Sequence, residues 1–279
     1  MKTQSADTSP DAERVQIALL RRASPAKRLG LALDLSAWTL NLSLVGLRRM
    51  HPEASVRDLL WMSVALRYGT TVAEQGRLHS GGDRDVSIPE NIRPAVAPVI
   101  AALDELGIPY YIGGSLASSL HGIPRSTMDV DLVAMLRPDQ VGALVGKLQD
   151  QYCVDEQAVR EAIQRRSSFN LIHFNTSLKV DIFVLKPRDY DQEAFRRRAH
   201  GEASEGPLTW ATPEDTVLAK LEWYRLGGET SERQWLDVLG VMKVQAEALD
   251  LAYLRQWAPD LGVTDLVERA LVEAGLTEE

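Results

Sequence analysis

Two aspartates on one apolar strand are the residues of this sequence best placed to do chemistry. Asp129 and Asp131 alternate with Val130 and Leu132 in the segment 128–136. Because successive side chains of a strand point to opposite faces, both carboxylates share one face. Two adjacent carboxylates repel each other, and a divalent cation removes that repulsion. Mg²⁺ binds carboxylates together with substrate phosphates, so the pair indicates metal-assisted chemistry on a phosphate compound.

A glycine turn upstream of the pair suits a phosphate group. Gly113, Gly114 and Ser115 end the strand predicted over 109–112 and open a short helix that reaches His121. Glycines let the backbone approach a ligand closely, and the free amides of a helix N-terminus attract phosphate. The two other Asp-x-Asp pairs, at 83/85 and 189/191, lack an apolar strand and are interpreted as solvated carboxylates.

A third acid, Asp181, lies within the apolar segment 178–185. An acid there is costly unless it is paired or binds metal. The segments 169–174 and 178–185 predict an antiparallel hairpin, and a neighbouring strand would bring Asp181 beside Asp129 and Asp131. Three carboxylates and a phosphate-binding turn favour phosphoryl or nucleotidyl transfer, with the third acid holding a second metal or acting as a base.

This combination resembles the DNA polymerase β-like nucleotidyltransferase superfamily. Members carry Gly-Gly or Gly-Ser after an apolar residue, a spacer, an Asp-x-Asp or Asp-x-Glu pair and a third acid on a later strand; here thirteen residues separate Ser115 from Asp129. The His121-Gly122 and Arg125 variant is similar to minimal and AbiEii-type nucleotidyltransferases, some of which are toxins of toxin–antitoxin pairs. The resemblance covers about residues 95–275.

The resemblance implies a role for each matching residue. The implied metal ligands and catalytic acids are Asp129, Asp131 and Asp181, the implied nucleotide-binding residues are Gly113, Gly114, Ser115 and Lys220, and the implied accessory residues are His121, Arg125, Arg233 and Asp237. It also implies Mg²⁺ or Mn²⁺, an NTP substrate, and transfer of the nucleoside monophosphate to a hydroxyl of tRNA, a protein or a small molecule.

The expected fold is α+β: a nucleotidyltransferase palm, which is a small mixed sheet flanked by helices, with a helical C-terminal region and a small all-helical N-terminal module. We expect the module over 1–75, a linker over 76–92, the palm over 93–200 and the C-terminal helices over 201–279. Within the module, a helix is predicted from about 27 to 50 and another over 56–68. The first has two apolar stripes, so we expect the module to dock on the palm, on a second copy of the chain, or on an antitoxin-like partner.

Composition limits the function classes. The net charge is −8, with +4 in residues 1–80 and −12 in the remainder, which disfavours a broad nucleic-acid footprint. The single cysteine, Cys153, forms no internal disulfide and fits a reducing cytoplasm. No secretory signal is recognised in the first residues, and the uncharged stretch 35–47 is short for a membrane span, so no membrane partner is expected.

Two alternatives stay open. One is a non-catalytic nucleotide-binding or regulatory protein on the same scaffold, against which the three intact acids argue. The other is an antibiotic adenylyltransferase, which has the same core and would differ only in its acceptor.

Overall fold

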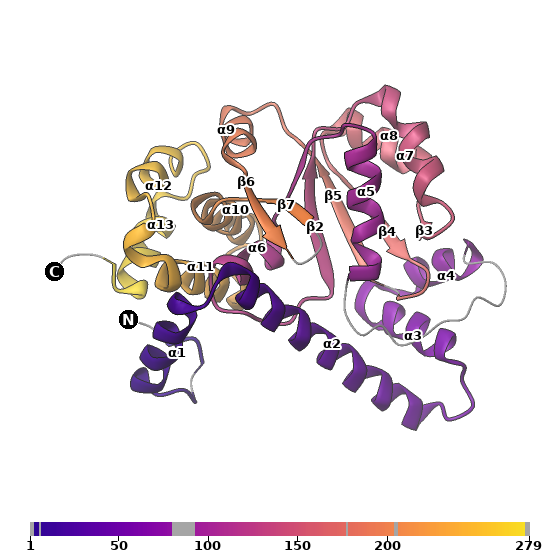
Figure 1. Ribbon diagram of the computed structural model, residues 1–279, viewed down its shortest axis with the longest axis horizontal. Coiled ribbons are helices and arrows are strands. Elements are labelled where there is room, and N and C mark those ends of the chain that lie inside the picture. The colour runs from indigo at the N-terminus through magenta and orange to yellow at the C-terminus, as the bar shows by residue number, and fades with distance from the viewer. Residues whose placement is uncertain (1–2, 6, 80–92, 177, 204–205, 277–279) are drawn as a thin grey trace. The chain divides into compact units, whose positions relative to one another are not determined.

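The protein has an α+β fold. The structure, a computed structural model, describes residues 3–5, 7–79, 93–176, 178–203 and 206–276. The α+β class is as the sequence predicts. Over these residues the chain has seven strands, of which the sequence predicted four, with helices packed against them (Figure 1). The chain divides into two compact units, each built from separate segments: unit 1 comprises Met1–Ala32, Tyr111–Arg125 and Pro187–Glu279, and unit 2 comprises Leu33–Tyr110 and Ser126–Lys186.

Unit 2 contains the strand order β3-β4-β5-β2, with β2 parallel to β5 and the other two neighbouring pairs antiparallel. The predicted hairpin is therefore confirmed as β4 and β5. The unit's strands are β2 (Asp129–Ala134), β3 (Tyr152–Cys153), β4 (Ser168–His173) and β5 (Lys179–Val184), and its helices are α3 (Val56–Tyr68), α4 (Thr70–His79), α5 (Ala97–Glu105), α7 (Val141–Leu148) and α8 (Glu156–Arg165).

Helices α3 and α4 have no separate core of their own. Trp61 and Val64 of α3 pack in one buried cluster with Ile172 and Phe174 of the β4 hairpin. A second cluster joins Leu59 and Leu60 to Leu40, Leu44 and Leu47 of helix α2 (Pro25–Met50). Helix α3 therefore packs on the β4–β5 hairpin, whereas the docking expected for the second apolar stripe of the long helix stays a prediction. Helix α4 occupies 76–79, where the sequence predicted linker; the rest of that linker lies outside the described residues.

Unit 1 contains the strand order β1-β7-β6, with β1 parallel to β7 and β6 antiparallel to β7. The β6–β7 hairpin corrects the expectation of a purely helical segment after residue 200. The unit's elements are α1 (Pro10–Arg22), β1 (Tyr110–Ile112, from Tyr111), α6 (Gly114–His121), α9 (Asp189–Arg197), β6 (Ala199–Ala203), β7 (Gly206–Trp210), α10 (Pro213–Leu226), α11 (Glu232–Gln245), α12 (Leu251–Trp257) and α13 (Thr264–Ala274).

The core of unit 1 lies among α10, α11, α12 and α13, around Leu218, Leu221, Trp235 and Leu271. Helix α1 is tied to α11 by a buried ion pair in which Lys243 Nζ lies 3.1 Å from Glu13 Oε1. Helix α1 was not expected; Ser9, which caps it, and Pro10 in its first turn are the signals for it.

One helix among the described residues, α2, is long and apolar enough to cross a membrane, as judged by length and composition. From the uncharged stretch 35–47 we expected no segment long enough to span a membrane. The helix is longer than that stretch because it extends beyond it on both sides. One third of its most apolar part is buried, and the core helix of a soluble protein meets the same criteria.

Candidate active site

The three predicted acids lie on the two central strands of unit 2. In the parallel register of β2 and β5, Asp131 is opposite Asp181 and Asp129 is opposite Lys179. The alternation of both strands puts these four side chains on one face, here called the acid face, while Val130 and Ile182 are buried on the other. The predicted approach of Asp181 to the Asp-x-Asp pair is confirmed; the catalytic roles stay predictions.

Local partners hold two of the carboxylates. Lys179 Nζ lies 2.7 Å from Asp181 Oδ2, and the Thr127 hydroxyl donates to Asp129 Oδ1 at 2.7 Å. Burial raises the pKa of Asp181, and the hydrogen bond and charge of Lys179 oppose that rise only in part.

The end of α3 lies against the acid face. The Tyr68 hydroxyl donates to the carbonyl oxygen of Met128, directly before Asp129, at 2.9 Å. Lys179 Nζ is 5.0 Å from the centre of the Tyr68 ring, and burial raises the pKa of Tyr68 to about 12. Sequence reasoning missed Tyr68 and Lys179, although Lys179 stands two residues before Asp181 and so shares its face.

Arg67 is the least satisfied cation of unit 2. Its Nη1 and Nη2 atoms are buried and have no hydrogen-bond partner within the described part of the chain. Burial lowers the pKa of Arg67, and the charge of Asp129 acts in the opposite direction. Nothing in the sequence distinguished Arg67 from the other arginines of the N-terminal helices.

The side chains of the acid face have the donor atoms that a metal ion prefers, but they are not positioned to bind one. Three carboxylates are the hard oxygen donors that Mg²⁺ prefers. Within the described residues, however, no three His, Cys, Asp or Glu side chains stand close enough together to hold a metal ion, and Lys179 already neutralises Asp181. Metal binding therefore requires the Lys179 ammonium to move off Asp181.

The predicted phosphate-binding residues Gly114, Ser115 and Lys220 belong to unit 1. Gly114 begins α6 with a φ of +54°, a conformation that favours glycine. Arg125 donates to both carboxylate oxygens of Asp237 at 2.6 and 2.7 Å and to the Ser115 hydroxyl at 2.7 Å. Lys220 Nζ lies 2.8 Å from Asp237 Oδ2 and 3.5 Å from Ser115 Oγ.

Asp237 pairs with two cations at once. Burial acts to raise the pKa of Asp237, but the hydrogen bonds from Arg125 and the charge of Lys220 outweigh it and lower that pKa. Two cations thus share one buried carboxylate beside the Ser115 hydroxyl, next to the N-terminus of α6. Such a cluster can accept an anion.

Two accessory residues lie apart from this cluster. The His121 Nε2 atom is 2.8 Å from the carbonyl oxygen of Ala211, and burial lowers the pKa of His121 to about 4, so the ring is neutral and donates this bond. Arg233 is exposed on α11, and no hydrogen bond or ion pair joins it to another described residue. The arginine that the structure places on Asp237 is Arg125.

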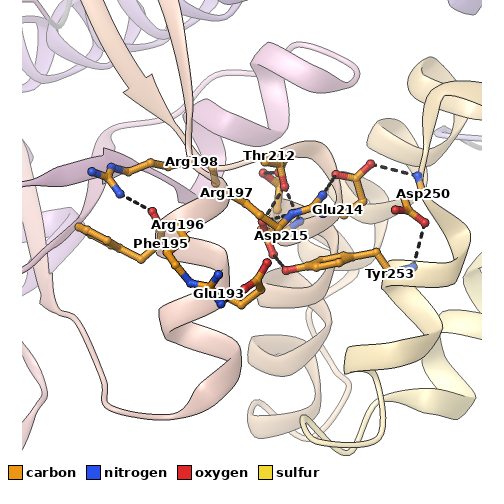
Figure 2. A network of polar contacts seen from close by, with 12 residues as sticks. Glu193, Phe195, Arg196, Arg197, Arg198, Thr212, Glu214, Asp215, Asp250 and Tyr253 are labelled. Carbon is orange, nitrogen blue, oxygen red and sulfur yellow. Dashed lines mark hydrogen bonds and ion pairs between the residues drawn. The ribbon is translucent and has the colours of Figure 1, made fainter.

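A further polar network in unit 1 has a structural role (Figure 2). Asp215 accepts hydrogen bonds from Thr212 at 2.6 Å and from the Tyr253 hydroxyl at 2.7 Å. Arg197 lies 3.0 Å from Glu214 and 3.6 Å from the centre of the Tyr253 ring. These contacts join α9, the start of α10 and α12, although the Nε atom of Arg197 is buried without a hydrogen-bond partner among the described residues.

Residues 21–85 match the family described as Rv0078B-related antitoxin. No curated protein sequence matches the chain.

Three solved structures of nucleotidyltransferases or nucleotidyltransferase-like proteins are similar to this chain. An antigenic nucleotidyltransferase-like protein from Paracoccidioides brasiliensis is 18% identical, with 62% of this chain and 91% of that one covered and a TM-score of 0.37. The structure of ANT(2")-Ia in complex with adenylyl-2"-tobramycin is 14% identical, with 61% and 95% covered and a TM-score of 0.36. A solution structure of the antibiotic-resistance factor ANT(2'')-Ia is 16% identical, with 65% and 92% covered and a TM-score of 0.34. Likenesses this distant do not assign a reaction.

Proposed function

We propose that the protein is a metal-dependent nucleotidyltransferase of the cytoplasm, which transfers a nucleoside monophosphate from an NTP to an acceptor hydroxyl. The observation that carries the proposal is the register of β2 and β5, which puts Asp129, Asp131 and Asp181 on one face beside Lys179. Asp129, Asp131 and Asp181 would hold Mg²⁺ or Mn²⁺, which when bound withdraws charge from the transferred phosphate.

The chain's own groups supply the remaining steps. Asp181, which is opposite Asp131 on the same face, suits a group that takes the proton of the acceptor hydroxyl. Arg125 and Lys220 beside Ser115 suit the phosphates of the NTP. The acceptor is tRNA, a protein side chain or a small molecule such as an aminoglycoside.

The test is a transfer assay. The purified protein is incubated with each α-labelled NTP, Mg²⁺ and separate tRNA, protein and aminoglycoside pools. We expect one pool to become labelled, and Asp131→Asn to abolish labelling without changing the melting temperature by more than a few degrees. Asp139→Asn, at a carboxylate that is 70% exposed, is the matched control and keeps full activity. Full activity in Asp131→Asn would contradict the assignment.

We also propose that the antitoxin-like helical segment restrains this reaction. The contacts that support it are the Tyr68 hydroxyl on the Met128 carbonyl and the buried Arg67 guanidinium near Asp129. Both α3 groups are next to Asp129, one of the acids predicted to bind the metal. The chain would then combine a toxin-type enzyme with its own restraint.

Arg67→Ala tests the restraint. We expect tighter binding of Mn²⁺ and faster transfer than in the wild type, because a positive charge near Asp129 is removed. Arg49→Ala, at an exposed arginine of α2, is the control and leaves both unchanged. Slower transfer in Arg67→Ala would mean that the guanidinium assists the substrate and would refute the restraint.

A second candidate is a regulatory protein on an inactive scaffold. The Lys179–Asp181 ion pair and the lack of a three-ligand group among the described residues favour it. The test measures binding of Mn²⁺ in the presence of NTP to the wild type and to Lys179→Met. If neither protein binds Mn²⁺, the result supports the regulatory protein against the enzyme.

A further inference from the structure

Helix α2 presents two apolar faces, and the described residues of the chain cover one of them. Leu40, Leu44 and Leu47 are buried against α3, with at most 4% of each side chain exposed. A second row is exposed by 38% to 72%; it consists of Leu31, Leu35, Trp38, Leu42 and Val45 and is called the α2 seam here. An exposed apolar row this long marks an interaction surface.

The spacing of the α2 seam selects the kind of partner. Its members follow one another at intervals of four, three, four and three residues. This is the a/d pattern of a coiled coil, in which each side chain fits between four side chains of a facing helix. The pattern lasts two heptads and lies within one continuous helix. The surface therefore fits another helix with the same spacing.

We propose that a second copy of this chain occupies the α2 seam, with the two α2 helices antiparallel. In this arrangement Trp38 of each copy packs beside Leu42 of the other, and Leu35 beside Val45. The bulky indole thus meets a leucine, whereas a parallel pair would put the two indoles in one layer.

Charges beside the seam support the antiparallel pairing. Asp34, Asn41 and Arg48 flank it on one side at intervals of seven residues. When two such helices run antiparallel, two pairs form in which Asp34 of one copy faces Arg48 of the other. Asn41 of one copy then faces Asn41 of the other. A parallel pair would instead place Asp34 opposite Thr39 and leave both charges unmatched. Arg48 also donates to the Ala54 carbonyl within its own chain, and a guanidinium has five N–H groups to share.

The mass of the full chain in solution tests the proposal. By analytical ultracentrifugation at micromolar concentration we expect a dimer. Leu42→Glu should weaken the dimer at least tenfold while leaving the melting curve of the monomer unchanged. The matched control is Leu66→Glu on α3, where the side chain is 73% exposed but lies outside the seam; it should remain dimeric. A wild type that stays monomeric, or a dimer that tolerates Leu42→Glu, would overturn the proposal.

Orientation has its own test. Asp34→Arg and Arg48→Asp should each weaken the dimer, and the double exchange should restore it. In a Cys153→Ser background, Asn41→Cys should cross-link efficiently with a short bis-maleimide, and Leu42→Cys more weakly. The reverse order would indicate a parallel pair. Sedimentation only with phospholipid vesicles would show a membrane on the α2 seam, and would also refute the dimer.

Discussion

At the scale of single residues, Asp237 is the group on which the unit 1 cluster depends. Its side chain is 4% exposed and balances Arg125 and Lys220, which are 24% and 12% exposed. Asp237→Asn leaves two cations close together without a counter-charge, so we expect a loss of about 2–4 kcal/mol in the free energy of unfolding. Asp265→Asn, at a carboxylate that is 70% exposed, should change it by less than about 0.5 kcal/mol. Urea denaturation at pH 7 measures both.

The sign of the pH dependence follows from the lowered pKa of Asp237. A carboxyl group whose pKa is lower in the folded state stabilises the fold above its unfolded pKa, and that contribution disappears as the pH falls through the lowered value. The difference between wild type and Asp237→Asn should therefore be full at neutral pH and shrink only below about pH 4. A difference that shrinks between pH 7 and pH 5 would contradict this origin.

Two buried histidines give a second pH prediction. Burial lowers the pKa of His121 and of His173 to about 4. Each stabilises the fold while neutral, so stability should fall as the pH drops from about 6.5 towards 4, with a slope approaching 1.4 kcal/mol per pH unit for each histidine. Thermal melts of His121→Gln should show a shallower fall in this range. His51→Gln, at an exposed histidine, should follow the wild type.

At the scale of elements, the contact of α6 with α11 depends on one glycine. A Cβ atom on Gly122 would lie 2.6 Å from the Val241 nitrogen and 2.9 Å from the Ser118 oxygen, both of which are backbone atoms. Gly122→Ala should therefore cost at least about 2 kcal/mol. Gly142→Ala, in α7 with nothing within 4 Å of the new atom, should instead stabilise by up to about 1 kcal/mol. Equal effects of the two changes in denaturant melts would refute the close approach.

The elements also show which features could be predicted from the sequence. Periodicity predicted α3 at its actual bounds and the β4–β5 hairpin, because Val56–Tyr68 follows a capping serine and both strands are apolar runs. The β6–β7 hairpin was missed, because His200, Gly201 and Glu202 carry no apolar alternation. The burial of Arg67 and the pairing of Arg125 with Asp237 could not be predicted, because they depend on tertiary contacts between residues far apart in the chain. The predicted division at residues 75, 92 and 200 stays a prediction.

At the scale of the whole molecule, the N-terminal residues do not share one core. Helix α1 is bound within unit 1, where Arg21 donates to the Lys243 carbonyl and Glu13 pairs with the Lys243 ammonium. Helix α3 belongs to unit 2, and its buried Trp61 packs with Ile172 and Phe174. The two halves of the predicted module therefore depend on different later parts of the chain. Removing those parts takes away the contacts of Glu13 with Lys243 and of Trp61 with Ile172 and Phe174, whereas Leu59 and Leu60 keep their contacts with α2.

Residues 1–79 expressed alone should consequently not behave as a folded domain. We expect partial helicity, a Trp61 emission typical of solvated indole, and no cooperative thermal transition, because Trp61 and Glu13 lack their partners. In the full chain, Trp61→Ala should cost about 3–5 kcal/mol, whereas Trp38→Ala, at a side chain that is 72% exposed, should leave the stability of the monomer nearly unchanged. The fragment could instead melt cooperatively as a monomer, with Trp61 shielded from quenchers. That result would contradict the prediction, because it would show that the N-terminal helices bury enough surface among themselves. Ile172 and Phe174 of the hairpin would then not be needed for their folding.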